Sequence, residues 1–173
     1  MRRSLWTLAL VIVGLAGCAN PSVVRVKSAN ISALTVSKVF VPRFEGNPDF
    51  VEESTDLFIA ELEPQISAQV IQGSVLRVES TDVVAGGNLA PADLAIAKAK
   101  ALGAQVVIMG KVTTSSGTGT FNGFATVRVL SVSDGTVLAS FHRPSGLLFG
   151  NSQHQAVMAA VERTAEDVAK ALR

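Results

Sequence analysis

Residues 91–114, PADLAIAKAKALGAQVVIMGKVTT, decide the fold class of this chain. Pro91 suits a first helical turn, Asp93 suits the positive end of a helix dipole, and Gly103 is a typical stop residue. The residues that follow, 104–114, are almost continuously apolar, which is typical of a strand buried on both faces. This stretch therefore predicts a helix that leads directly into the central strand of a sheet.

Two further strands are predicted downstream of the central one. Residues 115–123 (SSGTGTFNG) have the composition of a turn, and 124–133 (FATVRVLSVS) form the next strand. Asp134-Gly135 is a strong two-residue hairpin signal, and it leads into a strand over 136–144. The pattern indicates antiparallel strands added to one side of the central strand.

The chain ends in a predicted amphipathic helix, capped by Asn151 or Ser152. Its apolar positions recur at spacings of three and four, so they share one helical face. They are Val157, Val161, Ala165, Val168 and Leu172.

A strand and a helix are predicted upstream. The strand lies within 35–44 (TVSKVFVPRF), and Pro42 places it near a sheet edge or at a strand end. Asn47 can cap a helix in which Pro48 takes the first position. Pro64 should end or kink that helix one residue after Glu63.

The segment between this helix and residue 91 is less regular. A second helical piece can extend to Gln72, followed by a strand over 74–81 (SVLRVEST). Residues 83–90 (VVAGGNLA) are a predicted loop that contains Gly86 and Gly87. The whole order is then strand, helix, strand, helix, three strands, helix. It predicts an α/β (α+β) domain over residues 35–173, with helices packed on a single mixed sheet.

The first twenty residues predict an export signal. Arg2 and Arg3 precede an apolar run from Leu5 to Ala16, which is too short to span a bilayer but fits the hydrophobic region of a signal peptide. The run closes on a pattern that resembles the lipobox of bacterial lipoproteins. Its four positions are Leu15, Ala16, Gly17 and Cys18. An ordinary secretory signal and an N-terminal membrane anchor are the alternatives.

The lipobox resemblance implies a cellular location as well as a lipid modification. Residues 1–17 would be removed, Cys18 would carry diacylglycerol and a further acyl chain, and residues 18–34 would form a tether with a short strand at Val23 to Val26. Ala19 is not the Asp that retains enteric lipoproteins in the inner membrane. We therefore expect an outer-membrane lipoprotein whose domain faces the periplasm.

The sequence offers no clear catalytic set, metal site or cofactor motif. His142 and His154 have no ligand-type residues at metal-binding spacing, and Ser145 does not lie in a nucleophile elbow. Gly117 to Gly123 lack the following helix that a phosphate loop requires, so a hairpin is the better interpretation. The formal net charge of +1 and an aromatic content of 5% also argue against a nucleic-acid partner. We expect a non-enzymatic protein.

Two predicted loops are candidates for a partner or ligand surface. One contains Gly86 and Gly87, and the other contains Phe149 in GLLFGN. An exposed aromatic residue in a loop suggests a binding surface, although the favoured interpretation of Phe149 is that it covers one end of the core.

Three local motifs resemble known envelope proteins. They are V-x-V-P-x-F at Val39–Phe44, A-x-x-L-G-A-x-x-V-I-x-G-x-V at Ala99–Val112, and V-x-V-x-S-x-x-D-G-x-V-L at Val127–Leu138. Together they resemble the periplasmic domains of CsgG-type secretion lipoproteins and of LpoB-type lipoproteins, the penicillin-binding-protein activators. The N-terminal domain of TolB is similar as well. The chain has no room for the insertions that form a membrane barrel in the secretion family.

This resemblance implies a compact domain that binds a protein partner in the cell envelope. The leading hypothesis is an envelope assembly or activator factor, held to the lipid bilayer by the acyl chains on Cys18. The alternative is a periplasmic lipoprotein that binds a glycan or small ligand.

Overall fold

The computed structural model describes residues 23–27, 31, 34–74, 91–117, 120–145 and 152–173. The lipobox residues, most of the strand predicted over 74–81, and the loops that contain Gly86, Gly87 and Phe149 lie outside the described residues. No described helix is both long enough and apolar enough to cross a membrane.

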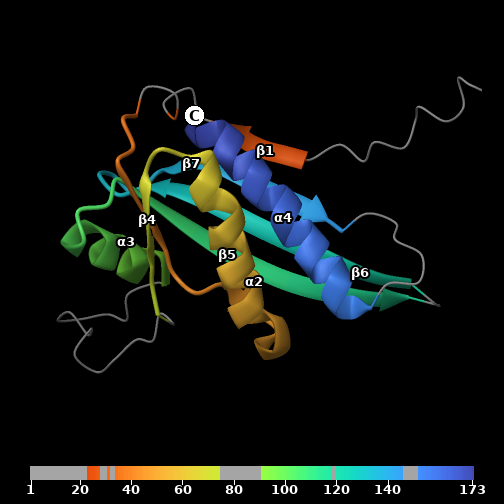
Figure 1. Ribbon diagram of the computed structural model, residues 1–173. Coiled ribbons are helices and arrows are strands. Elements are labelled where there is room, and N and C mark those ends of the chain that lie inside the picture. The colour runs from red at the N-terminus through yellow and green to blue at the C-terminus, as the bar shows by residue number, and fades with distance from the viewer. Residues whose placement is uncertain (1–22, 28–30, 32–33, 75–90, 118–119, 146–151) are drawn as a thin grey trace, which may run out of the picture.

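In the part of the chain that the structure describes, one mixed sheet of seven strands organises the domain (Figure 1). Its order is β1-β7-β6-β5-β2-β4, and the short β3 pairs with β5. Strands β2, β3, β4 and β5 pair in parallel, and the other pairs are antiparallel. The strands are β1 (Val23–Lys27), β2 (Lys38–Val41), β3 (Glu45–Gly46), β4 (Gln69–Gln72), β5 (Val106–Gly117), β6 (Thr120–Ser131) and β7 (Val137–Pro144).

The helices lie on both faces of this sheet. They are α2 (Pro48–Leu62), the 3-10 helix η2 (Glu63–Gln65), α3 (Pro91–Ala101) and α4 (Gln153–Leu172). Helices α2 and α4 lie side by side on one face, and α3 packs on the other near β4 (Figure 1). The predicted fold class and the predicted central position of β5 are confirmed.

The larger core lies between the sheet and helices α2 and α4. Phe58 and Leu62 from α2 meet Ile108 from β5 and Val161 from α4, and all four are fully buried. A smaller cluster lies under α3, where Ala95, Ala99, Val107 and Leu130 pack with Phe40. The two faces of the sheet are therefore covered to different extents.

Most of the predicted helix boundaries are confirmed. The Asn47 side chain accepts a hydrogen bond from the Asp49 backbone N–H at 3.1 Å, and Pro48 takes the first helical position. Helix α2 ends at Leu62, just before Pro64. Helix α4 begins with a capping box in which Ser152 and Gln155 satisfy each other's backbone N–H groups.

The second helical piece, predicted to extend to Gln72, is wrong. After η2 the chain turns into β4, which pairs in parallel with β2 from Gln69 to Gln72. Its centre, Val70-Ile71, is β-branched, and such residues fit a pleated sheet better than a helix. Pairing with an available strand decided the conformation of this short segment.

The hairpin between β5 and β6 is much longer than predicted. Pairing extends from Val106↔Ser131 to Gly117↔Thr120, so most of the predicted turn over 115–123 belongs to strands. Thr is enriched in strands, and polar side chains fit a strand whose one face is open to water.

The connection between β6 and β7 also differs from a two-residue turn. It runs over 132–136, and Gly135 has a φ of +71°. Hydrogen bonds from the Ser131 side chain and from Thr136 lower the pKa of the Asp134 carboxyl. The Asp-Gly pair therefore marks the turn without setting its length.

Strand β1 extends the sheet beyond β7. Residues Val23 to Lys27 pair antiparallel with Ala139 to His142, so the short strand predicted within the tether is confirmed and belongs to the sheet of the domain. Only a bulge between Val24 and Val26 interrupts the register. The sheet therefore includes a segment that begins five residues after Cys18, the predicted lipid attachment site.

One buried hydroxyl predicts a stabilising substitution. Ser54 in α2 is fully buried, and its Oγ has no hydrogen-bond partner among the described residues. Because an unsatisfied buried hydroxyl keeps its desolvation cost, Ser54→Ala should raise the free energy of unfolding by about 1 kcal/mol. Urea denaturation measures this change.

Thr55 provides the matched control for that experiment. Its Oγ1 accepts from the Phe44 backbone N–H at 3.0 Å and donates to the Val51 carbonyl at 2.7 Å. Thr55→Val should therefore lower stability by about 1–2 kcal/mol, because it leaves the Phe44 N–H unpaired. A loss of stability in Ser54→Ala would contradict the assignment of an unsatisfied hydroxyl.

Candidate functional site

Helix α3 covers only part of its face of the sheet. Val107 and Leu130 lie buried beneath it, whereas the side chains farther along the same face are exposed or half-buried. We call this surface the open face. It consists of Met109, Lys111 and Thr113 from β5, Phe124, Thr126 and Arg128 from β6, and Ser140 and His142 from β7.

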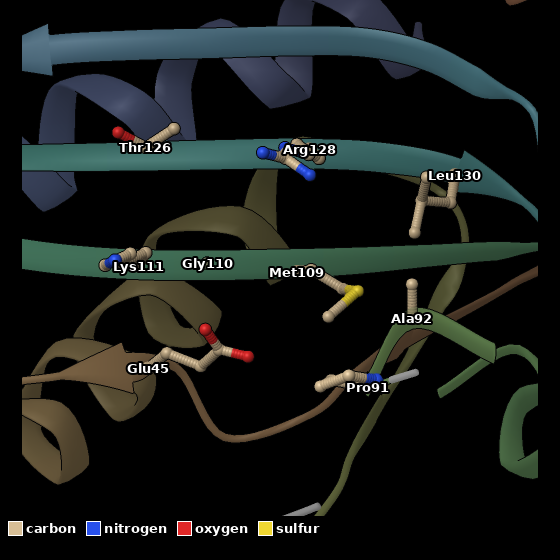
Figure 2. A pocket seen from close by; sticks show the side chains of 9 residues that line it. All are labelled: Glu45, Pro91, Ala92, Met109, Gly110, Lys111, Thr126, Arg128 and Leu130. Carbon is tan, nitrogen blue, oxygen red and sulfur yellow. The ribbon is translucent and has the colours of Figure 1, made fainter. Parts of the chain in front are cut away.

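A cavity of about 350 Å³ lies where the open face meets α3 and β3 (Figure 2). Such a volume is near the lower end of small-molecule sites, which span roughly 300–1,000 Å³. Figure 2 shows the lining side chains on the side of the sheet away from α2 and α4. They are Glu45, Pro91, Ala92, Met109, Gly110, Lys111, Thr126, Arg128 and Leu130.

Charged side chains from three strands line this cavity. Lys111 pairs with Thr126 and Met109 pairs with Arg128, so the two cationic residues are diagonal neighbours on one face. Glu45 lies in register with Lys111 on the other side of β5. Among the residues that the structure describes, none of the three charged side chains makes a hydrogen bond or an ion pair.

The remaining lining is largely apolar. Met109 and Leu130 line one side of the cavity, and Pro91 and Ala92 from the first turn of α3 line another (Figure 2). Leu130 is 5% exposed, so the core beneath α3 fixes this part of the wall. The cavity therefore combines two cations, one carboxylate and an apolar surface.

Thr126 is held by a neighbour outside the cavity. Its Oγ1 is 2.8 Å from Nδ1 of His142, and the His142 ring stacks on Phe124 with centroids 5.6 Å apart. A hydroxyl has one hydrogen to donate and two lone pairs to accept with. Thr126 therefore keeps hydrogen-bonding capacity toward the cavity while His142 orients it.

His154 and Ser145, which the sequence offered as possible metal-binding or catalytic residues, make contacts that hold parts of the fold together. His154 Nε2 is 2.6 Å from Glu53 Oε2, which links α4 to α2. Ser145 is buried, its Oγ accepts from the Gly123 N–H, and its backbone N–H donates to the Gly123 carbonyl. Within the described ranges, no group of three or more His, Cys, Asp or Glu side chains could hold a metal ion.

Sequence reasoning missed the cavity. Its candidate residues Leu15, Ala16, Gly17, Cys18, Gly86, Gly87 and Phe149 all lie outside the described residues. The available signal was the two-residue spacing of Met109 and Lys111, and of Thr126 and Arg128, which puts each pair on one face of its strand. Pairing of the two strands then brings both cations to the same face of the sheet. The contributions of β3 and α3 depend on the tertiary fold.

No protein-family model matches the sequence, and no curated protein matches it. Among solved structures, the fold is similar to that of a PelC variant from Paraburkholderia phytofirmans, which forms a dodecamer. The sequence identity is 18%, the match covers 73% of this chain and 84% of that one, and the TM-score is 0.52. At this identity, the similarity concerns the fold alone.

Two weaker similarities involve other bacterial proteins. The C-terminal domain of LpoB from Salmonella enterica is 18% identical, with coverage of 66% of this chain and 90% of that one and a TM-score of 0.44. Lipoprotein GNA1162 from Neisseria meningitidis is 18% identical, with coverage of 79% and 99% and a TM-score of 0.46. Both of these proteins are similar to this chain only at a low TM-score, and the CsgG-type part of the resemblance gains no support from these comparisons.

Proposed function

We propose that this chain is a non-enzymatic outer-membrane lipoprotein, anchored through Cys18, whose domain acts by contact with another envelope protein. The observation that carries the proposal is the complete lipobox, Leu15 to Cys18, after a charged and apolar leader. Acyl chains on Cys18 would hold the protein at the bilayer, since each buried methylene contributes about 0.8 kcal/mol.

The fold supports a role in protein assembly. PelC, which shares this fold at a TM-score of 0.52, is a dodecamer. The same architecture can therefore present surfaces for protein contact. The partner in such a contact is either a second envelope protein or another copy of this chain.

Exposed apolar side chains suggest where contact would occur. Leu102, the residue after α3, is 43% exposed, and Val137 is 41% exposed at the start of β7. Both lie at the end of the sheet where Val132 N–H donates to the Gln105 carbonyl. Phe121, 43% exposed, lies toward the opposite end, near the β5–β6 turn.

Photo-crosslinking in cells tests this proposal. A photoreactive amino acid placed at Leu102, Val137 or Phe121 should give a discrete adduct with another envelope protein or with a second copy. Lys170, an exposed position on α4, provides the control and should give none. The absence of an irradiation-dependent adduct from all three apolar positions would contradict function by protein contact.

The cavity favours a second candidate function, binding of a glycan or small ligand. This alternative needs a site of suitable size with unpaired polar groups, and the cavity on the open face has both. The two functions are compatible, because the exposed apolar residues do not line the cavity.

A further inference from the structure

We propose that the cavity on the open face binds a uronate, an acidic sugar unit. The carboxylate of the sugar would pair with Lys111 and Arg128, and its hydroxyls would hydrogen-bond to Glu45 and Thr126. This inference concerns a small ligand, so it stands or falls independently of a protein partner.

The two cations indicate a carboxylate. Lys111 and Arg128 are diagonal neighbours on one face and have no anionic partner among the described residues. Both side chains are exposed, so solvent weakens the repulsion between these diagonal neighbours, and an anion that bridges them would gain from both charges. A guanidinium can bind both oxygens of a carboxylate, and the Lys111 ammonium adds a second charge-assisted hydrogen bond.

Glu45 indicates that the ligand also carries hydrogen-bond donors. Its carboxylate points toward the cavity in Figure 2 and makes no ion pair with Lys111, although the two residues lie in register. An ionised carboxylate only accepts hydrogen bonds. It would repel a bare anion but accept hydrogen bonds from sugar hydroxyls, and Thr126 can exchange hydrogen bonds with the same groups.

The apolar wall and the size of the cavity suit a sugar ring. Met109, Leu130 and Ala92 offer a surface on which the C–H groups of a ring can pack. A volume of about 350 Å³ limits the ligand to a small unit. A uronate combines the three required properties, namely one carboxylate, several hydroxyls and an apolar ring face.

Calorimetric titration of the full-length protein in detergent tests the proposal. D-glucuronate should bind at least tenfold more tightly than D-glucose, which differs from it only in carrying a hydroxymethyl group in place of the carboxylate. Lys111→Gln and Arg128→Gln should each weaken D-glucuronate binding at least fivefold. Lys170→Gln removes a cation far from the cavity and should leave the Kd within twofold. Unchanged melting temperatures would show that the variants remain folded.

Glu45→Gln separates a sugar site from a simple anion site. This substitution should weaken D-glucuronate binding at least threefold yet strengthen acetate binding, because it replaces one charged acceptor oxygen with an amide NH2 group and removes a repulsive charge. Equal binding of glucuronate and glucose would overturn the proposal. So would acetate binding as tight as glucuronate binding, or glucuronate affinity that Lys111→Gln and Arg128→Gln leave unchanged.

Discussion

Gly123→Ala should lower the free energy of unfolding by about 3 kcal/mol, at the upper end of what a core overpacking substitution costs. A methyl group built on Gly123 would lie 2.4 Å from the carbonyl carbon of Ala156 and from the backbone nitrogen of Val157. These are backbone atoms of α4, so no side-chain rotation relieves the overlap. The helix would have to move off the sheet.

Calorimetry or thermal circular dichroism would measure the effect as a decrease of roughly 10 °C in the melting temperature. Gly103→Asn provides the control. Gly103 has a φ of +70°, which Asn tolerates, and an added Cβ there meets nothing within 4 Å. A melting temperature of Gly123→Ala within 2 °C of that of the parent protein would contradict the close packing of the α4 backbone against β6 at Gly123.

Cys18→Ser should abolish fatty-acid attachment and stop removal of residues 1–17. Lipid transfer needs a thiolate nucleophile, and a serine hydroxyl has no comparable anionic form near neutral pH. Labelling of cells with an alkyne fatty acid, followed by gel detection, should show a strong band for the parent and background for the variant. The variant should also be missing from the outer-membrane fraction.

Ala19→Ser controls for the disturbance of this region, because it changes the neighbouring residue but keeps the lipobox and adds no Asp. Its labelling and its outer-membrane fraction should match those of the parent. Fatty-acid labelling of Cys18→Ser at the parent level would contradict attachment at this residue.

The sequence predicted most of the architecture because its long elements have strong local signals. Helix α4 carries a capping residue and a regular apolar face, and β5 is apolar enough to identify as the central strand. Short segments were harder to predict from the sequence. Four residues, Gln69 to Gln72, have too little periodicity to distinguish a strand from a helix, and only pairing with β2 decides between them.

The site was less predictable for a related reason. The cavity combines Glu45 from β3, Pro91 from α3, Lys111 from β5 and Arg128 from β6, so its members are spread over more than eighty residues of sequence. Alternation along β5 and β6 places the two cations on one face, but their position relative to Glu45 depends on parallel pairing of β3 with β5. No local pattern carries that information.

Intact-mass spectrometry of the full-length gene product, purified from cell membranes, tests the central claim most directly. The account predicts a chain that begins at Cys18 and carries the added mass of a diacylglyceryl group together with an acyl group on the new N-terminus. A mass equal to the unmodified 173-residue chain, or to a processed chain with an unmodified Cys18, would contradict it.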